Sequence, residues 1–374
     1  MTTVTFLLSK DPVLQGAADV QMSCHVMRLA AEAFDVSAMC LSAETGSLTA
    51  DVVPNGLPLT RVAKGQVRPA ALLAGAVRRR RSLVHLRFDK DALVDIIEDC
   101  NADKFVAEHS YMAESFLRSS RFGDAKLIVN THVSDGLVWQ STRGLLGRID
   151  GPRILRDEMR VAKAADAVGT YDAEEAEYYR NHGVKNVRWI EMSLPPDTQI
   201  DVAANPPRLV CLGMREWPPN QEAFLEALRL WPRIADGIPD AELCIVGGKK
   251  QGAKDPEYPD GVRDLGFVDD LEGFLATCRA LVAPIRTGGG QRTKILEVVS
   301  RGLPVVATKP GVGSLGSFGL SCFDDDDAFV AECRRYLLDR DAAGRDGDRL
   351  YDINRQLWTD ERPHRAVEEL LSSC

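Results

Sequence analysis

The chain has 374 residues, of which 45% are hydrophobic and 27% are charged, and its formal net charge is −9. This length is too great for one ordinary hydrophobic core, so we expect two domains of a soluble globular protein. No apolar run approaches the roughly 20 residues that cross a bilayer, and the N-terminus lacks the basic start of a signal peptide. The nine cysteines contain no CxxC pair, which argues against a zinc-type site and indicates reduced thiols in a cytoplasm.

In the first half of the chain, short apolar and β-branched runs alternate with longer helical patterns. The predicted strands are residues 3–9, 35–42, 82–88, 104–109, 126–132, 167–171 and 187–192. Buried strands that alternate with helices are typical of a parallel sheet covered on both faces, so we predict a doubly wound α/β domain.

A basic cluster lies within this half. Residues 61–90 contain nine Lys and Arg and one acid, Asp89, and the centre of the cluster is Arg78, Arg79, Arg80 and Arg81. One interpretation is the solvated end of a surface helix, where cations suit the helix dipole. The other is a surface for an anionic partner, which could be a membrane, a phosphorylated acceptor or a nucleic acid. The sequence leaves both open.

The periodic pattern stops at residues 193–207, SLPPDTQIDVAANPP, whose Pro, Asn and Asp content predicts a linker. The alternation then restarts, with predicted strands at 208–213, 242–248, 262–268, 280–285 and 303–308. We therefore predict a first domain over 1–196, a second α/β domain over 197–352, and a C-terminal helix over 353–374 that packs back on the first domain.

The second domain contains the stretch TGGGQRTKILEVVSRGLPVV, which begins at Thr287. Three glycines (Gly288, Gly289 and Gly290) precede a predicted helix at about 291–301. Glycines let a backbone approach a ligand closely, and free N–H groups at a helix start bind anions. Arg292 and Lys294 oppose the helix dipole but suit a phosphate. The alternative is an ordinary surface pair between Lys294 and Glu297.

Two other sequence patterns resemble ligand sites, but we interpret neither of them as one. The segment GVGSLG, from Gly311, matches the dinucleotide-binding pattern, but Pro310 precedes it and no amphipathic helix follows. We interpret it as a loop rather than an NAD site. The acidic run at 324–327 is interpreted as a solvated loop and helix start rather than a metal site.

The second half resembles the donor-binding domain of GT-B glycosyltransferases, in particular retaining family 4, the glycosyl transferases group 1. The matching blocks occur in family order over about residues 208–316: LVCLGMREWPPNQEAFLEAL, PDAELCIVGG, VRDLGFVDDLEGFLATCRALVAPI and GGGQRTKILEVVSRGLPVVAT. The first half is similar more weakly, through IVNTH and VAKAADAVGT. The resemblance implies two Rossmann-like doubly wound domains that face each other across a cleft.

The resemblance also implies a nucleotide-diphosphate sugar of the UDP or GDP type as co-substrate, with no separate cofactor. No DxD-like pair is convincingly placed in the sequence, so we expect no metal. Glu297 matches the family glutamate that holds the ribose hydroxyls. Arg292, Lys294 and the glycine loop would hold the pyrophosphate, with Arg215 as a second cation. The residues expected to contact the base are Gly266, Phe267 and Val268.

One position departs from the family pattern. Many members have a second glutamate eight positions before the ribose glutamate, where it contacts the transferred sugar, and here that position is Gly289. The donor sugar therefore stays open, and so does the hypothesis of a GT-B-like binding protein that has lost catalysis.

The first domain is expected to supply the acceptor side. Gly16 follows the first predicted strand, where the family has a glycine-rich loop, and His132 resembles a family histidine near the reaction centre. A structural histidine at a strand end is the alternative for His132. Glu108 and His109, at the end of the preceding strand, are further candidates.

The sequence thus predicts a retaining, metal-independent glycosyltransferase of class EC 2.4 with an unidentified acceptor. We expect it in the cytoplasm, with peripheral attachment to a membrane as one use of the basic cluster. The alternatives are the inactive binding protein, and an epimerase of nucleotide sugars or a dehydrogenase on a related scaffold.

Overall fold

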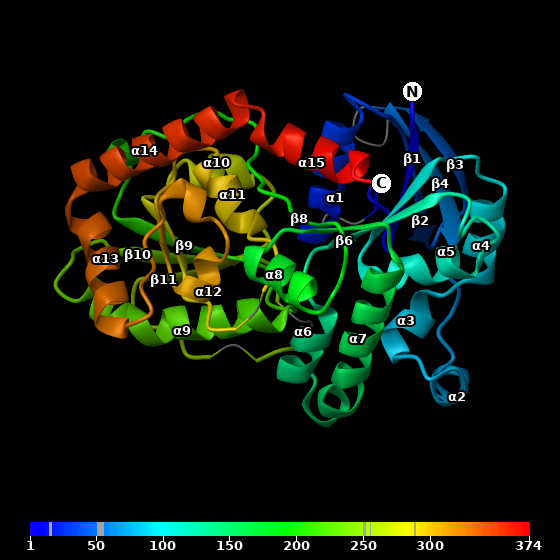
Figure 1. The fold of residues 1–374 in the computed structure, drawn as a ribbon. Coiled ribbons are helices and arrows are strands. Elements are labelled where there is room, and N and C mark those ends of the chain that lie inside the picture. Colours follow the sequence, from blue (N-terminus) through cyan, green and yellow to red (C-terminus); the bar gives the residue numbers. More distant parts are fainter. Residues whose placement is uncertain (15–16, 51–55, 250–251, 255, 288) are drawn as a thin grey trace. The chain divides into compact units, whose positions relative to one another are not determined.

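The computed structural model describes residues 1–374 except 15–16, 51–55, 250–251, 255 and 288 (Figure 1). The chain forms two compact units. The first comprises Met1–Glu191 together with Pro363–Cys374, and the second comprises Met192–Arg362. Within the described ranges, no helix is both long and apolar enough to cross a bilayer.

The first unit contains an eight-stranded sheet. Its strands are β1 (Thr3–Leu8), β2 (Asp35–Ser42), β3 (Gly46–Ala50), β4 (Gly56–Ala63), β5 (Lys104–Glu108), β6 (Lys126–Thr131), β7 (Ala167–Thr170) and β8 (Val187–Trp189). The order is β3-β4-β2-β1-β5-β6-β7-β8, and only the β3–β4 pair is antiparallel. The direction of winding reverses between β1 and β5, which is where ligands bind in doubly wound sheets.

Helices cover this sheet, and large apolar side chains fill the space between the layers. The helical segments are α1 (Ala18–Ala30), α2 (Pro69–Arg79), α3 (Leu83–Phe88), α4 (Asp91–Glu98), η1 (Ser110–Met112), α5 (Ala113–Arg118), α6 (Asp135–Thr142), α7 (Gly144–Ala164), α8 (Ala173–Asn181) and α15 (Arg362–Ser372). In the core, the rings of Phe105 and Phe116 lie 4.9 Å apart between centroids. The Lys104 ammonium donates to the carbonyls of Leu371 (2.5 Å) and Cys374 (2.7 Å), which holds the C-terminal segment on this unit.

The predicted strand at 82–88 is wrong, because this segment forms helix α3. Ser82 caps the helix by accepting a hydrogen bond from the His85 amide. The Ser82 and Leu83 amides in turn donate to the buried carboxylates of Asp157 (2.6 Å) and Asp150 (3.0 Å) on α7. A short apolar run does not distinguish a strand from a buried helix, and here the cap and the α7 carboxylates decide.

The other predicted strands are confirmed, most with shorter ends, but β3 and β4 were not predicted. Pro58 interrupts the apolar pattern of β4, where Leu57, Leu59 and Val62 are buried. A proline lowers the strand signal because it cannot donate to the ladder. Pairing with β2 on one side and β3 on the other nevertheless forms the strand.

The second unit contains a five-stranded parallel sheet in the order β11-β10-β9-β12-β13. Its strands are β9 (Arg208–Leu212), β10 (Glu242–Val246), β11 (Val262–Gly266), β12 (Ala280–Ala283) and β13 (Val305–Ala307). Its helical segments are η2 (Val202–Ala204), α9 (Pro218–Ala235), α10 (Leu271–Leu275), α11 (Thr293–Val299), α12 (Lys309–Val312), η3 (Gly316–Phe318), α13 (Asp326–Leu338) and α14 (Arg340–Thr359). The winding reverses between β9 and β12.

The segment predicted as a linker, 193–207, is anchored on the second unit. The amides of Asp197 and Ile200 donate to the carbonyls of Ser300 (3.1 Å) and Arg301 (2.9 Å). The Asn205 side chain donates to the Cys278 carbonyl at 2.7 Å. The C-terminal helix was predicted to begin at residue 353, but helix α14 continues without a break through that position. The C-terminal segment that belongs to the first unit begins at Pro363.

The cap of α3 generates a stability prediction. Ser82→Ala removes the cap and also the hydrogen bond of 2.8 Å between the Ser82 hydroxyl and His85 Nδ1. We expect the free energy of unfolding of the first unit to fall by about 1–3 kcal/mol in urea denaturation. Ser141→Ala, at an exposed serine of α6, is the matched control and should change it by less than about 0.5 kcal/mol. Equal effects of the two substitutions would contradict the role of Ser82.

Candidate functional site

The reversal of winding in the second sheet defines where its site should lie. Parallel sheets of this kind bind ligands outside the carboxyl ends of the two strands that flank the reversal. In this unit those strands are β9 and β12. The segments that follow them are residues 213–217 and the glycine loop, residues 284–292, which leads into α11. Gly288 lies outside the described residues.

Lys294, in the first turn of α11, lies at the end of β9. Its ammonium donates to the carbonyl of Leu212, the last residue of the strand, at 2.8 Å and to Oδ1 of Asn220 on α9 at 2.7 Å. Burial and the nearby Arg292 lower the pKa of Lys294 to about 8. An ammonium has three N–H donors, so these two bonds leave one available to a ligand.

Glu297 lies one turn further along α11, and its carboxylate is half-buried. Within the part of the chain that the structure describes, it makes no hydrogen bond or ion pair, including none with Lys294. The neighbouring cation Arg301 pairs instead with Asp197 (2.5 Å) and Glu272 (2.8 Å). Burial raises the pKa of Glu297 above its ordinary value. A partly desolvated carboxylate without a partner is an acceptor that a bound hydroxyl can satisfy.

Arg292 precedes α11 and donates to backbone carbonyls. Its Nε bonds Pro310 (2.8 Å) and Gly311 (3.0 Å), and its Nη1 bonds Gly290 (2.8 Å). The guanidinium therefore ties the glycine loop to the GVGSLG segment, where α12 is a single turn and the short η3 follows. The strand–turn–helix context of a dinucleotide site is not formed there.

Helix α11 is shorter than the predicted helix at 291–301, since it begins at Thr293 and ends at Val299. Gly290 has φ +78°, a conformation that favours glycine. At Gly289 an added Cβ would meet no atom within 4 Å, so a side chain would fit there. Both amide atoms of Gln291 are buried without a hydrogen-bond partner in the described structure. The sequence contains no signal that would have singled out Gln291.

Arg215 follows β9, as predicted, but its guanidinium is bound to a carboxylate of β11, which lies two strands away in the sheet. It makes two hydrogen bonds of 2.9 Å to the two carboxylate oxygens of Asp264 on β11. Asp264 also accepts from the Tyr258 hydroxyl (2.6 Å) and the Gly266 amide (3.1 Å). Burial opposes the charge on Asp264, yet these hydrogen bonds lower its pKa below the ordinary value. Asp264 thus braces both Arg215 and the predicted base-contacting segment, and sequence reasoning missed it.

The segment predicted to contact a base lies at the end of β11. Gly266 has φ +61°, and its carbonyl accepts from the Gly247 amide at 2.7 Å. The next side chain, Phe267, is 75% exposed, and Val268 is half-buried. An exposed aromatic ring at the carboxyl edge of a parallel sheet is available to a planar ligand.

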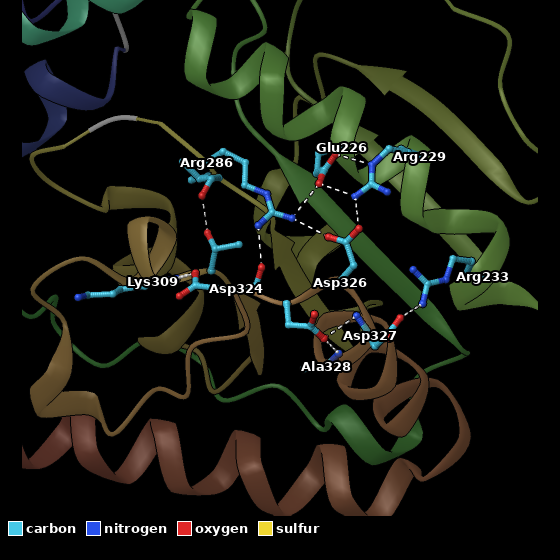
Figure 2. Close-up of polar contacts among 12 residues, drawn as sticks. Glu226, Arg229, Arg233, Arg286, Lys309, Asp324, Asp326, Asp327 and Ala328 are labelled. Atoms are coloured by element: carbon cyan, nitrogen blue, oxygen red, sulfur yellow. Dashed lines mark hydrogen bonds and ion pairs between the residues drawn. The ribbon is translucent and has the colours of Figure 1, made fainter.

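A network of ion pairs holds the start of the glycine loop (Figure 2). Arg286, after β12, donates to Glu226 of α9 (2.9 Å), Asp326 of α13 (2.7 Å) and the Asp324 carbonyl (2.8 Å). Arg229 of α9 bridges the same two carboxylates, at 2.7 and 2.6 Å. Hydrogen bonds from these arginines lower the pKa of Glu226 to about 2. The next residue, Thr287, donates to Glu222 of α9 at 2.5 Å.

The acidic run at 324–327 belongs to this network. The predicted helix start is confirmed, because Asp325 caps α13 through the amides of Asp327 and Ala328. The run is more than a solvated loop, however, since Asp326 pairs with Arg286 and Arg229, and Asp327 pairs with Arg233 (Figure 2). Among the described residues, no group of His, Cys, Asp and Glu is arranged to hold a metal ion. The sequence could not reveal the network, because its members come from three distant elements.

In the first unit, the predicted residues Glu108 and His132 are hydrogen-bonded to each other. Glu108 ends β5 and His132 follows β6, and Oε2 lies 2.5 Å from Nε2. Burial opposes ionisation, but hydrogen bonds from His132, Asn130 (3.0 Å) and Ser23 (2.8 Å) lower the pKa of Glu108. An ionised Glu108 only accepts hydrogen bonds, so the Nε2–H of His132 donates to it. Nδ1 of His132 is buried and has no hydrogen-bond partner among the described residues.

His109 packs beside this pair, with its ring 4.7 Å from that of His132 and stacked on Tyr111 at 5.0 Å. Its φ of +78° is unusual for a residue with a side chain, and the hydrogen bond of 2.8 Å from its amide to the Asn130 carbonyl helps to hold it. Burial lowers the pKa of His109, although Asp19 lies 3.5 Å from Nε2. The structure therefore brings together three of the predicted acceptor-side residues.

The fourth predicted residue there, Gly16, lies outside the described residues.

The basic cluster divides into two kinds of arginine. Arg79 pairs with Asp89 at 2.8 Å, and Arg81 lies 4.0 Å from Asp157. Arg78 and Arg80 are exposed, and their side chains make no ion pair within the described structure. Arg79 and Arg81 therefore have partners within the protein, whereas the exposed side chains of Arg78 and Arg80 are the ones available to an anionic partner.

Two doubly wound α/β units, one with a mostly parallel sheet and one with a parallel sheet, define the class of protein. Sucrose-phosphate synthase from Thermosynechococcus elongatus matches with a TM-score of 0.73 at 14% identity, over 99% of this chain and 98% of that one. HepE of Anabaena, in complex with UDP and glucose, matches with 0.67 at 14% identity over 100% of both chains. WaaG, a glycosyltransferase involved in lipopolysaccharide biosynthesis, matches with 0.67 at 13% identity over 99% and 100%. The predicted GT-B fold is confirmed.

Residues 206–339 match the family described as Glycosyl transferases group 1. The resemblance seen in the sequence is therefore confirmed for this region, which contains β9 to β13 and the whole glycine loop. No curated protein sequence matches the chain significantly.

The network around Arg286 generates a prediction about the glycine loop. Arg286→Gln removes the contacts to Glu226 and Asp326, so the amides of residues 289–292 should exchange hydrogen about tenfold faster. Hydrogen exchange measured by mass spectrometry tests this. Arg233→Gln is the matched control, because Arg233 pairs with the same turn of α13 without touching the loop. Faster exchange of the loop in both variants, or in neither, would contradict the anchoring role of Arg286.

Proposed function

We propose that the protein is a glycosyltransferase that moves a sugar from a nucleotide-diphosphate sugar to an acceptor hydroxyl or similar nucleophile. The observation that carries this proposal is the unpaired carboxylate of Glu297, next to Lys294, on the helix that follows the glycine loop. Both residues lie within the region that matches the glycosyl transferases group 1. They also lie beside the reversal of winding, where the fold binds ligands.

We assign the donor contacts residue by residue. The Glu297 carboxylate accepts hydrogen bonds from the two ribose hydroxyls, and the remaining N–H of Lys294 donates to the diphosphate. Gly289 and Gly290 allow the backbone to approach the phosphates. Gly266, Phe267 and Val268 form the base side, held by Asp264. Because the Anabaena neighbour is described in complex with UDP and glucose, we propose UDP as the first nucleotide to test.

Transfer breaks the bond between the anomeric carbon of the sugar and the diphosphate oxygen, and the diphosphate leaves with the electron pair. A bond between the anomeric carbon and the acceptor atom, which loses its proton, replaces it. The negative charge that develops on the diphosphate is the main demand on the protein. We propose that Lys294 contacts this charge and that Arg292 adds positive charge while it holds the loop. With these cations the transfer needs no metal, and retention of configuration is carried over from the family resemblance.

On the acceptor side we propose that His132 receives the acceptor hydroxyl at its free Nδ1. Glu108 holds the ring through Nε2, as an orienting carboxylate does for a catalytic histidine. His109 packs against the same ring and limits its movement. The arrangement suits a neutral nucleophile that must lose a proton during transfer.

The second candidate is a GT-B-like protein that binds the donor without turnover. The departure at Gly289 favours it, since no carboxylate is available there for the transferred sugar. Donor hydrolysis separates the two candidates: release of free sugar from UDP-, GDP- or dTDP-sugars supports the transferase. Binding without release supports the inactive protein. We place either protein in a reducing compartment such as the cytoplasm, because all nine cysteines are free.

Glu297→Ala tests the ribose contact. Losing hydrogen bonds to a charged acceptor should weaken the binding of UDP or the preferred nucleotide by roughly 10- to 100-fold in calorimetry. Asp352→Ala, at an exposed carboxylate of α14, should bind as the wild type does. Unchanged affinity of the Glu297 variant would refute the assignment, and thermal-shift screening of nucleotide sugars identifies the ligand to use.

The lowered pKa of Lys294 gives a pH-dependent prediction. Without ligand, Lys294 is mostly neutral above its pKa of about 8. A diphosphate nearby favours the charged form and raises this pKa, so binding at about pH 8.5 should take up a proton. At about pH 6.5 Lys294 is already charged, so nucleotide binding should cause no proton uptake by this residue. Calorimetry in buffers of different ionisation enthalpy measures this uptake. Lys294→Met should abolish it, and equal uptake in that variant would exclude Lys294 as its source.

A further inference from the structure

Helix α2 in the first unit presents two of its three large apolar side chains outward, while the third, Leu72, is half-buried. Its only buried residue is Ala76. The small Gly75 packs toward Leu86 of α3, which an added Cβ would approach at 3.6 Å. Leu73 and Val77 are exposed, and Val77 is 74% exposed. A surface helix normally turns its large apolar residues inward, so this inverted arrangement indicates a surface that is covered in use.

The hairpin of α6 and α7 repeats the inversion. Glycines stand where the two helices approach most closely: a Cβ on Gly147 would lie 1.9 Å from the Trp139 carbonyl oxygen, and one on Gly151 would lie 2.4 Å from Gln140. The outer positions are large and aliphatic. Leu137, Leu145, Leu146 and Ile149 are exposed, and Leu145 is 74% exposed.

The two features lie at one end of the first unit. Figure 1 shows α2 and the joined ends of α6 and α7 projecting on the same side of its sheet. A hydrogen bond of 2.6 Å from Arg156 of α7 to the Arg80 carbonyl, at the end of α2, links them. We call the exposed apolar residues of α2 and of the α6–α7 hairpin, with their flanking arginines, the α2–α7 surface.

Positive charge surrounds this surface. Neither residues 61–88 nor residues 136–149 contain an acid. Arg68, Arg78 and Arg80 flank α2, and Arg148 and Arg153 lie along α7. All five are exposed and make no ion pair among the described residues. The apolar side chains thus lie among cations that form no ion pair in the part of the chain that the structure describes.

We propose that the α2–α7 surface docks on an anionic lipid bilayer. Exposed leucine, isoleucine and valine side chains beside arginines fit the boundary between acyl chains and anionic headgroups. Single-stranded nucleic acid would need aromatic rings for stacking, and the exposed large side chains here are aliphatic. A second copy of the chain would bring like charges together, which opposes self-association. The inference concerns the first unit and does not depend on sugar transfer.

Sedimentation of the full-length protein with vesicles tests the docking. We expect binding to vesicles of phosphatidylcholine with about one-third phosphatidylglycerol, much weaker binding to pure phosphatidylcholine, and weaker binding at high salt. Replacing Arg78 and Arg80 by Ser together should reduce the affinity by about 30-fold. Leu73→Ser with Val77→Ser should reduce it at least about tenfold.

Leu338→Ser with Arg355→Ser is the matched control, because these exposed residues lie on the second unit; Leu338 is 62% exposed. This variant should bind vesicles as the wild type does. All variants change exposed residues, and unchanged thermal unfolding without vesicles checks their folding. Binding to neutral vesicles alone, equal binding by the α2 variants, or no vesicle binding would overturn the proposal. Loss of single-stranded DNA binding or of a dimer in the α2 variants, without vesicle binding, would overturn it in favour of those partners.

Discussion

The hydrogen bond from Lys294 to the Leu212 carbonyl joins the helix of the glycine loop to the central strand of the second sheet. Because β9 and β12 flank the reversal of winding, this bond fixes α11 at the edge where the fold binds ligands. The orientation of Glu297, one turn along the same short helix, depends on it. Burial disfavours the charged form of this ammonium, which lowers its pKa to about 8.

Around that bond, arginines that resemble ligand-binding groups instead hold the framework in shape. Arg215 is bound by Asp264, Arg292 by backbone carbonyls, and Arg286 by two carboxylates. Each one fixes a different segment around the glycine loop. This preorganisation favours ligand binding, because less of the binding free energy is lost in ordering the loop. Positive charge is retained near the loop at the same time.

In the first unit, the buried polar pair at the edge of the sheet and the exposed apolar surface lie on different elements. The carboxyl ends of β5 and β6 hold the buried Glu108–His132 pair, whose geometry is set by Asn130 and Ser23. The α2–α7 surface, by contrast, uses glycine and alanine for packing and leaves its aliphatic side chains outside. Helices that pack through small residues approach closely, which frees the larger side chains for contact with something else.

Local patterns in the sequence determined most of the strands, the two α/β units and the position of Glu297 after a glycine loop, because periodicity and glycine content act over a few residues. They also carried the resemblance to the glycosyl transferases group 1. Only the tertiary structure decided that residues 82–88 form a helix, since the Asp150 and Asp157 carboxylates that hold its first turn lie far along the chain. The partners of Arg215, Arg286 and Glu108 were decided in the same way. The order of the strands brings distant residues together, and no local pattern encodes that order.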